Sequence, residues 1–325
     1  MFTAGKTSID WREIIKILKD KFGELIESDK PLAPFNTFGT GGMAKLFAEV
    51  HSEKELSSLI KESNRYQLPI FMLGGGSNLL VSDYGYDGLV IRNSIMGLKV
   101  SEEAIIAGAG ESLQEMVDFA TNNGLAGLEF ATGIWGTVGG AIFGNAGAYG
   151  LDISSALKSV QLVDKQGNIR NELTSYFEFS YRNSVLKKTG EFVAHAEFSL
   201  RAGKKEEIRK KTDEILAERR KKLPFEEHSA GCFFKNIVDK NYEHGKLPAG
   251  KLLEEVGAKE IHYGGACVFE KHANIIINNG SATSKDIRNL AEILKSRVKE
   301  KFGIELREEI TYLGTFEEEG LSTDL

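Results

Sequence analysis

The sequence contains little cysteine and little proline, and each shortage narrows the possibilities. Only Cys232 and Cys267 occur, with no CxxC pair, so neither a disulfide framework nor a metal site is predicted. Five prolines, a hydrophobic content of 41% and a charged content of 27% are typical of a folded globular chain. At 325 residues, we expect two or three compact units of ~100 to 150 residues each.

Long apolar runs and an excess of positive charge are also missing. No stretch approaches the ~20 apolar residues that span a bilayer, and the first residues carry no apolar signal segment. A formal net charge of -6 provides no basic field for a polymeric nucleic acid, although a local cluster could bind a nucleotide. We therefore expect a cytoplasmic protein that contacts neither membrane nor nucleic acid.

Helix and strand patterns alternate along the chain without an internal repeat. Asp10 and Glu13 form a capping-box pattern before a first amphipathic helix, and residues 44–73 read as a βαβ unit. Residues 203–222 have the charge spacing of a solvated connecting helix. The predicted class is α+β, and its extended segments include residues 180–186, 232–236, 275–278 and 305–314.

A glycine run follows a buried strand of the βαβ unit. Gly74, Gly75 and Gly76 leave successive backbone N–H groups available to an anion, and Ser77 and Asn78 add side-chain donors. The run is not a Walker loop, because no Gly-Lys-Ser/Thr closes it, and it lacks the spacing of a dinucleotide fingerprint. A tight turn between two strands would explain a single run of this kind equally well.

A second glycine-rich stretch covers residues 127–150, with eight glycines in 24 residues. Glycine at this density allows the backbone to approach a flat or anionic ligand closely. Two such loops in one chain indicate a long cofactor.

Several segments occur in an order that resembles a known family, the UDP-N-acetylenolpyruvoylglucosamine reductases. The resemblance runs from about residue 31 to residue 314, and about 50 residues between Arg182 and Cys232 are similar to the family's shorter layout. The segments are GGGSNLLV (74–81), GTVGGAIFGNAGAYG (136–150), YRNS (181–184), AGCFFKN (230–236) and HANIIINNG (272–280).

The resemblance implies a flavin enzyme of peptidoglycan precursor synthesis. NADPH would reduce FAD, and UDP-N-acetylglucosamine enolpyruvate would then be reduced to UDP-N-acetylmuramate. The implied fold is an FAD-binding domain of the vanillyl-alcohol-oxidase (PCMH) type with a C-terminal α+β substrate domain. The expected divisions are residues 1–66 (N-terminal α/β part of the FAD-binding unit), 67–202 (its second subdomain) and 203–325 (substrate-binding domain).

The family motifs also assign residues to the cofactor. The pyrophosphate would lie on residues 74–78, the isoalloxazine beside residues 132–149, and Arg219 would reach the flavin. Trp135 stands where the family usually has proline, which puts an N–H and a large ring into this loop. The implied cofactor positions are Gly74, Gly75, Gly76, Ser77, Asn78, Thr132, Gly133, Gly139, Ala141, Asn145, Gly147, Tyr149 and Arg219.

Three positions match catalytic residues of the family. Arg182 would bind the enolpyruvyl carboxylate, since a guanidinium forks onto a carboxylate. Cys232 stands where the family usually has a serine proton donor, and Glu309 matches a C-terminal glutamate, with Glu308 on the opposite face. A thiol with a reference pKa of ~8.5 can deliver a proton at neutral pH, and we also expect iodoacetamide to alkylate it.

Weaker matches assign five residues to the substrate: Tyr181, Lys222, Asn236, His272 and Asn274. A lysine on a charged helix usually faces solvent, and a histidine before a buried strand is usually structural, so those readings stay open.

Two other functions remain open at this point. One is another flavin-dependent oxidoreductase on the same fold, and the other is a non-catalytic nucleotide-binding module. For the reductase reading, we expect a small-molecule partner, the UDP-sugar enolpyruvyl ether, and a monomer.

Overall fold

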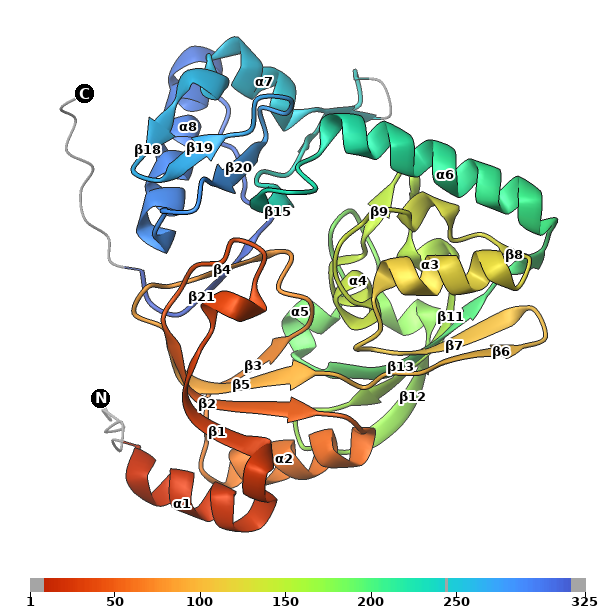
Figure 1. Ribbon diagram of the computed structural model, residues 1–325, viewed down its shortest axis with the longest axis vertical. Coiled ribbons are helices and arrows are strands. Elements are labelled where there is room, and N and C mark those ends of the chain that lie inside the picture. The colour runs from red at the N-terminus through yellow and green to blue at the C-terminus, as the bar shows by residue number, and fades with distance from the viewer. Residues whose placement is uncertain (1–8, 243–244, 317–325) are drawn as a thin grey trace.

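The first part of the chain forms a four-stranded sheet with two helices on one face (Figure 1). Its elements are α1 (Trp11–Phe22), β1 (Ile26–Pro31), β2 (Met43–Val50), α2 (Glu53–Arg65), β3 (Ile70–Leu73) and β5 (Tyr86–Asn93). In the computed structural model, which describes residues 9–242 and 245–316, the strand order is β1-β2-β5-β3. Since β2 and β3 both run parallel to β5, the expected βαβ unit is present with β5 inserted into it.

Side-chain caps fix where both helices begin. Asp10 Oδ1 accepts the backbone N–H groups of Arg12 and Glu13, and Ser52 Oγ accepts that of Glu55 at 3.2 Å. Leu18 of α1 and the α2 side chains Leu56 and Leu59 are fully buried against the sheet. Burial of each such side chain contributes about 1.5–3 kcal/mol and holds the helices on the sheet, as the amphipathic pattern of the first helix predicts.

The middle part of the chain is a five-stranded antiparallel sheet. Its strands are β6 (Leu98–Ser101), β7 (Ala104–Gly108), β11 (Leu157–Val163), β12 (Ile169–Leu173) and β13 (Phe192–Ser199), in the order β12-β11-β13-β7-β6. Helices α3 (Leu113–Asn122) and α4 (Val138–Gly144) bury apolar side chains in the same core as the sheet. Shorter elements are β8 (Leu125–Ala126), β9 (Gly147–Ala148), β10 (Leu151–Asp152), α5 (Leu186–Thr189) and β14 (Arg201–Ala202).

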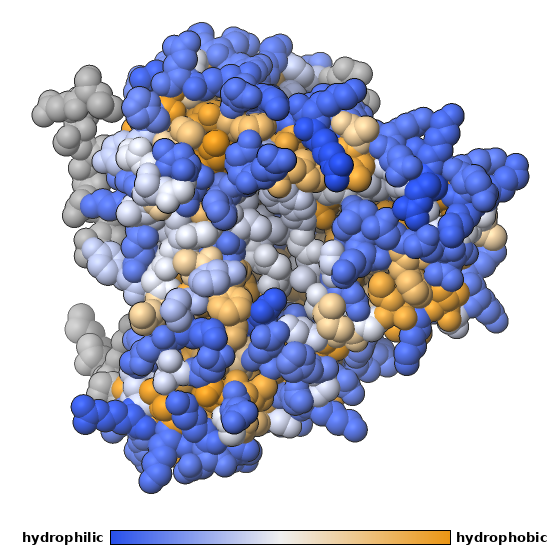
Figure 2. All heavy atoms as spheres, viewed as in Figure 1, coloured by the Kyte–Doolittle hydropathy of each residue, from blue (hydrophilic) through white to orange (hydrophobic). Residues whose placement is uncertain are grey.

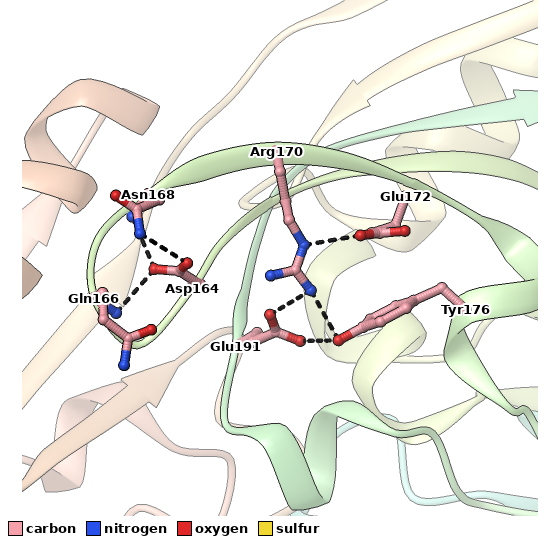
Figure 3. Close-up of polar contacts among 7 residues, drawn as sticks. All are labelled: Asp164, Gln166, Asn168, Arg170, Glu172, Tyr176 and Glu191. Carbon is pink, nitrogen blue, oxygen red and sulfur yellow. Dashed lines mark hydrogen bonds and ion pairs between the residues drawn. The ribbon is translucent and has the colours of Figure 1, made fainter.

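A polar network secures the turn between β11 and β12, which the sequence predicts at residues 165–168 (Figure 3). Asp164 accepts the backbone N–H groups of Gln166 and Asn168, each at 2.8 Å. Beside it, the Arg170 side chain contacts three partners: Glu172, Tyr176 and Glu191. This network belongs to the sheet and lies outside the glycine-rich loops.

The C-terminal part is a second α+β body that a long helix connects to the middle sheet (Figure 1). The connector, α6 (Lys205–Lys222), contacts α3 through an ion pair of 3.4 Å between Arg209 and Asp118. Beyond it, the sheet order is β15-β20-β19-β18, and α7 and α8 complete the body. The elements are β15 (His228–Cys232), β16 (Ile237–Val238), β17 (Lys246–Leu247), α7 (Ala249–Glu255), β18 (His262–Tyr263), β19 (Ala266–Val268), β20 (Ile275–Asn278) and α8 (Ser284–Phe302).

After α8 the chain returns to the first part of the molecule. Strand β21 (Thr311–Leu313) pairs in parallel with β4 (Leu79–Val81), which directly follows the glycine run at residues 74–78. Figure 1 shows this late segment lying among the earliest strands. The pairing places Glu309 next to the glycine run, although more than two hundred residues separate them in sequence.

Three extended segments differ from the sequence prediction. The sequence predicts that segment 232–236 is extended, but strand β15 ends at Cys232. The N–H groups of Phe233 and Phe234 bond to the carbonyl and the side chain of Asn274 and do not continue the pairing with β20. Only Thr311–Leu313 of the segment 305–314 forms a strand. Residues 180–183 form a tight turn in which Arg182 has φ +55, so the predicted strand-like conformation of this segment is wrong.

The three predicted divisions of the chain remain predictions. The first sheet takes strands from both sides of the boundary at residue 66, and α6 of the third division packs on α3 of the second. Within the described residues, no helix is long and apolar enough to span a membrane.

Candidate active site

The two glycine-rich loops lie against each other. Ser77 Oγ donates to the carbonyl of Trp135 at 3.0 Å, and a Cβ on Gly74 would stand 2.6 Å from Thr137 Oγ1. Gly76 has φ +62, and a Cβ there would overlap the carbonyl oxygen of Phe35. Glycine is required for this approach, because other residues would strain the loop and push it off its neighbours.

Buried polar atoms without partners mark the same region. Thr132 is 1% exposed, and among the described residues its Oγ1 has no hydrogen-bond partner. The Nε of Arg219 is likewise buried and unbonded, while its Nη2 donates to the carbonyl of Gly133 at 3.2 Å. An unsatisfied buried polar group costs about 1–3 kcal/mol, so the two atoms fit a polar ligand that lies along these loops. The residues present therefore fit an FAD.

Three of the implied cofactor positions serve the protein's own packing. The N–H of Gly139 donates to the carbonyl of Ala109 at 2.9 Å, and Ala141 is buried in the core of the middle sheet. Asn145 has φ +46 at the end of α4 and is 2% exposed. Its Nδ2 donates to the Asp152 carboxylate and to the carbonyl of Ser180, both at 3.0 Å. Asn145 thus holds the turn that carries Arg182.

The β9–β10 hairpin connects that turn to α6. Gly147, on β9, accepts a bond of 3.1 Å from Arg182 Nη1 through its carbonyl. Tyr149, at the hairpin tip with φ +54, bonds to the Arg219 guanidinium through its hydroxyl. Burial lowers the pKa of Arg219, which nevertheless remains a cation at any physiological pH.

Arg182, Cys232 and Glu309 come together from three separate segments. Arg182 Nε lies 2.5 Å from Glu309 Oε1, in an ion pair whose angle is not that of a hydrogen bond. The backbone N–H of Glu309 donates to the carbonyl of Phe233 at 2.8 Å, directly after Cys232. Burial, followed by the Glu309 carboxylate, raises the pKa of the Cys232 thiol to about 11, although Arg182 and Arg219 oppose the rise.

Glu308 faces away from this group, as expected from sequence. Its carboxylate accepts a bond of 3.0 Å from the Tyr312 hydroxyl and lies 3.6 Å from the ammonium of Lys295 on α8. In the view of Figure 2, which is that of Figure 1, the molecule is hollowed at its centre, and residues of intermediate hydropathy lie in the hollow.

Tyr181 and Asn236 lie beside the group. The Tyr181 hydroxyl accepts the N–H of Asn236, and burial, then the Glu309 carboxylate, raises its pKa. Asn236 Oδ1 accepts the N–H of Ala249 at 3.1 Å, where α7 begins. The ammonium of Lys246 stands 3.6 Å from the centre of the Tyr181 ring, which is a close cation–π contact.

The other implied substrate residues have different surroundings. Asn274 is 2% exposed, and its amide bonds both the N–H and the carbonyl of Phe234, so it fixes the segment after Cys232. His272 Nδ1 accepts the N–H of Asn274 at 3.2 Å, and burial lowers its pKa. Lys222 is exposed and pairs with Glu218 at 2.7 Å. None of these contacts reaches Arg182, Cys232 or Glu309.

Sequence reasoning missed the lysines around this group. Lys187 Nζ donates to the carbonyl of Arg182 at 2.7 Å, and burial together with Lys235 lowers the pKa of Lys187. No signal in the sequence distinguishes Lys187, Lys235 or Lys246 from other exposed lysines. Trp135, in contrast, turns its ring onto Phe225 with centroids 5.5 Å apart and so joins the second loop to the segment after α6.

Comparison with known families first defines the class of protein. The family model of the FAD binding domain matches residues 44–171. The model of the UDP-N-acetylenolpyruvoylglucosamine reductase C-terminal domain matches residues 223–313. The fold is therefore the expected FAD-binding domain followed by a C-terminal α+β domain, and the chain is a flavoprotein oxidoreductase.

Individual relatives match over nearly their whole length. The UDP-N-acetylenolpyruvoylglucosamine reductase of Solibacter usitatus is 38% identical over 303 residues, covering 89% of this chain and 97% of the relative. That of Caldanaerobacter subterraneus is 41% identical over 305 residues, covering 92% and 99%. The crystal structure of the enzyme from Thermus caldophilus superposes with a TM-score of 0.73 at 32% identity, covering 89% of this chain and 98% of that one.

The chain belongs to the UDP-N-acetylenolpyruvoylglucosamine reductase family. This confirms the resemblance seen in its sequence, and it sets aside the alternative of a non-catalytic nucleotide-binding module.

Proposed function

We propose that the protein catalyses the NADPH-dependent, FAD-mediated reduction of UDP-N-acetylglucosamine enolpyruvate to UDP-N-acetylmuramate in peptidoglycan precursor synthesis. The observation that carries this proposal is the meeting of Arg182, Cys232 and Glu309 beside the two glycine-rich loops. The names of the relatives support the substrate and the reaction. We further propose that the protein acts as a cytoplasmic monomer.

The glycine-rich loops and Arg219 would hold the FAD. Residues 74–78 offer backbone N–H groups to the pyrophosphate, and the orphaned Thr132 hydroxyl and Arg219 Nε gain acceptors along the same surface. When bound, FAD supplies the hydride that it has taken from NADPH.

Arg182 would orient the substrate carboxylate. Its guanidinium is held in one plane by the carbonyl of Gly147 and the carboxylate of Glu309. A fixed, planar cation suits a carboxylate, and it stabilises the negative charge that develops beside the enol ether carbon during reduction.

Cys232 would donate the proton that completes the reduction. With a pKa of about 11, its thiol keeps the proton throughout the neutral range and is available as a general acid. Once the proton has moved to the substrate carbon, Arg182 and Arg219 favour the thiolate that remains.

Substitution of Cys232 tests this function. In Cys232→Ala we expect reduction of bound FAD by NADPH to stay within about threefold of wild type, and reoxidation by the enolpyruvyl substrate to slow by roughly 10²- to 10⁴-fold. Cys232→Ser, which keeps a proton on a smaller atom, should retain much of the second half-reaction. Unimpaired turnover of Cys232→Ala would remove the thiol from the mechanism. Rapid oxygen consumption by wild type without reduction of the UDP-sugar would instead indicate another flavin-dependent activity.

A further inference from the structure

Asn78, the last residue of the first glycine run, holds the main chain from the Glu309 carbonyl to the Thr311 N–H. Its side-chain Nδ2 donates to the carbonyl of Glu309 at 3.1 Å, and its own carbonyl accepts the N–H of Thr311 at 3.0 Å. From Leu79 onward, the parallel pairing of β4 with β21 continues this contact. A residue expected only to face the cofactor therefore also binds the segment that carries the catalytic glutamate.

The Glu309 main chain is therefore hydrogen-bonded to two parts of the site, the segment after Cys232 and the glycine run. Its N–H is bound to the carbonyl of Phe233, next to Cys232, and its carbonyl is bound to Asn78, next to the glycines. Its carboxylate reaches a third segment at Arg182. A displacement of Asn78 must therefore change the orientation of the Glu309 peptide, and with it the distance from the carboxylate to the thiol and the guanidinium.

The glycine run is well suited to transmit such a displacement. The run is packed against the residues around Phe35 and Thr137, and a pyrophosphate bound to its N–H groups would lie within the same five residues as Asn78. Asn78 is exposed and its contact with Glu309 is a single hydrogen bond, so this contact strengthens or weakens with the order of the run.

We propose that Asn78 is a positioning residue that sets Glu309 in place when the glycine run is occupied by the cofactor. Binding of the FAD pyrophosphate would thus complete the proton-transfer group as well as anchor the flavin. This inference rests on the proposed function where it is tested by the kinetics of the two half-reactions. Where it is tested by amide hydrogen exchange, it needs only that the protein binds FAD.

The neighbouring Ser77 offers a matched control. Its hydroxyl belongs to the same run but donates to the carbonyl of Trp135 and forms no hydrogen bond with residues 307–313. Ser77→Ala perturbs cofactor binding without touching Glu309, whereas Asn78→Ala perturbs both.

The kinetic test compares the half-reactions of the two variants at saturating FAD. In Asn78→Ala we expect reduction by NADPH within about threefold of wild type and reoxidation by the enolpyruvyl substrate at least about tenfold slower. Ser77→Ala should show no such difference between the half-reactions. Equal slowing of both half-reactions in Asn78→Ala, or no slowing of either, would contradict the proposal.

Amide hydrogen exchange provides a test that does not depend on turnover. Addition of FAD to wild type should slow exchange of the Glu309 N–H by about tenfold or more, and Asn78→Ala should lose most of this effect while Ser77→Ala, once saturated, keeps it. The Thr311 N–H, which is bound by the main-chain carbonyl of Asn78, should stay protected in both variants. Equal protection in Asn78→Ala would overturn the inference. Failure of wild type to reduce the enolpyruvyl ether would sink the proposed function but leave the exchange comparison decisive.

Discussion

The Cys232 thiol is a weaker acid in the protein than a free cysteine. At its reference pKa, a small but reactive thiolate fraction would be present at neutral pH. Burial and the neighbouring carboxylate raise the pKa to about 11, so the protonated form dominates. The same environment that suits the thiol to proton donation makes it a poor nucleophile at neutral pH.

The rate of Cys232 alkylation by iodoacetamide should therefore be low at neutral pH and should rise steeply with pH. The rise from a reference of 9.0 to about 11 lowers the thiolate fraction at pH 7.5 by about 10²-fold, and the rate should increase as pH rises through 11. Mass spectrometry of the labelled Cys232 peptide gives the rate. In the Cys232→Ser variant only Cys267 can be labelled, so this variant gives the background rate of Cys267 alkylation. Rapid alkylation at pH 7.5 would contradict the raised pKa.

Two asparagines that motif matching assigned to ligands have hydrogen-bond partners within the protein. The amide of Asn274 is used by the Phe234 backbone, and that of Asn145 by Asp152 and Ser180. A sequence gives the residue type but not its hydrogen-bond partners, so a buried asparagine that holds a loop looks the same as one that binds a ligand. In both cases the side chain positions a residue of the site, Cys232 or Arg182.

At the level of elements, the sequence predicts helices better than irregular extended segments. Asp10 carries a local capping signal, and its side chain caps α1 where expected; Ser52 caps α2 in the same way. The turn at Arg182 carries no such signal. Its positive φ depends on bonds from Asn145 and Lys187, which lie 37 positions before it and five after it, so only the folded structure specifies it.

The first glycine run supplies a prediction about backbone conformation. Gly76→Ala would place a Cβ against the Phe35 carbonyl at φ +62, so we expect FAD retention to fall by at least about tenfold. Gly250→Ala is the control, because it lies in α7, outside both glycine-rich loops, where the atom nearest to a new Cβ would be at an ordinary 3.5 Å; it should be neutral or stabilising by about 0.5–1 kcal/mol. Flavin absorbance after gel filtration measures retention. A fully loaded Gly76→Ala protein would show that the run tolerates a side chain.

On the scale of the whole molecule, the site is assembled by the return of the C-terminal segment. Family motifs predict that Arg182, Cys232 and Glu309 act together, but they contain no information about the β4–β21 pairing that brings Glu309 to the glycine run. A three-residue parallel pair between distant segments is too short to show a periodic signal, and burial does not alternate along it: β4 is buried throughout, while Thr311 and Tyr312 of β21 are both partly buried.

This arrangement predicts a single cooperative unfolding transition that FAD moves as a whole. At 100 times its Kd, FAD should add about 2.7 kcal/mol to the free energy of unfolding. Because β21 ties the C-terminal body to the first sheet, differential scanning calorimetry should show one transition that shifts upward with FAD. Two separate transitions, of which FAD moves only one, would show that the bodies unfold independently.

The β4–β21 pair also fixes when during translation an active protein can exist. Leu79 and Thr311, which face each other in the pair, are about 230 positions apart, so at roughly 5–20 residues per second a nascent chain waits on the order of 10–50 s between exposing the first and making the second. Throughout that interval β4, next to the glycine run, has no β21 to pair with. The site is therefore assembled only after β21 has been made, and a shorter nascent chain cannot catalyse the reduction.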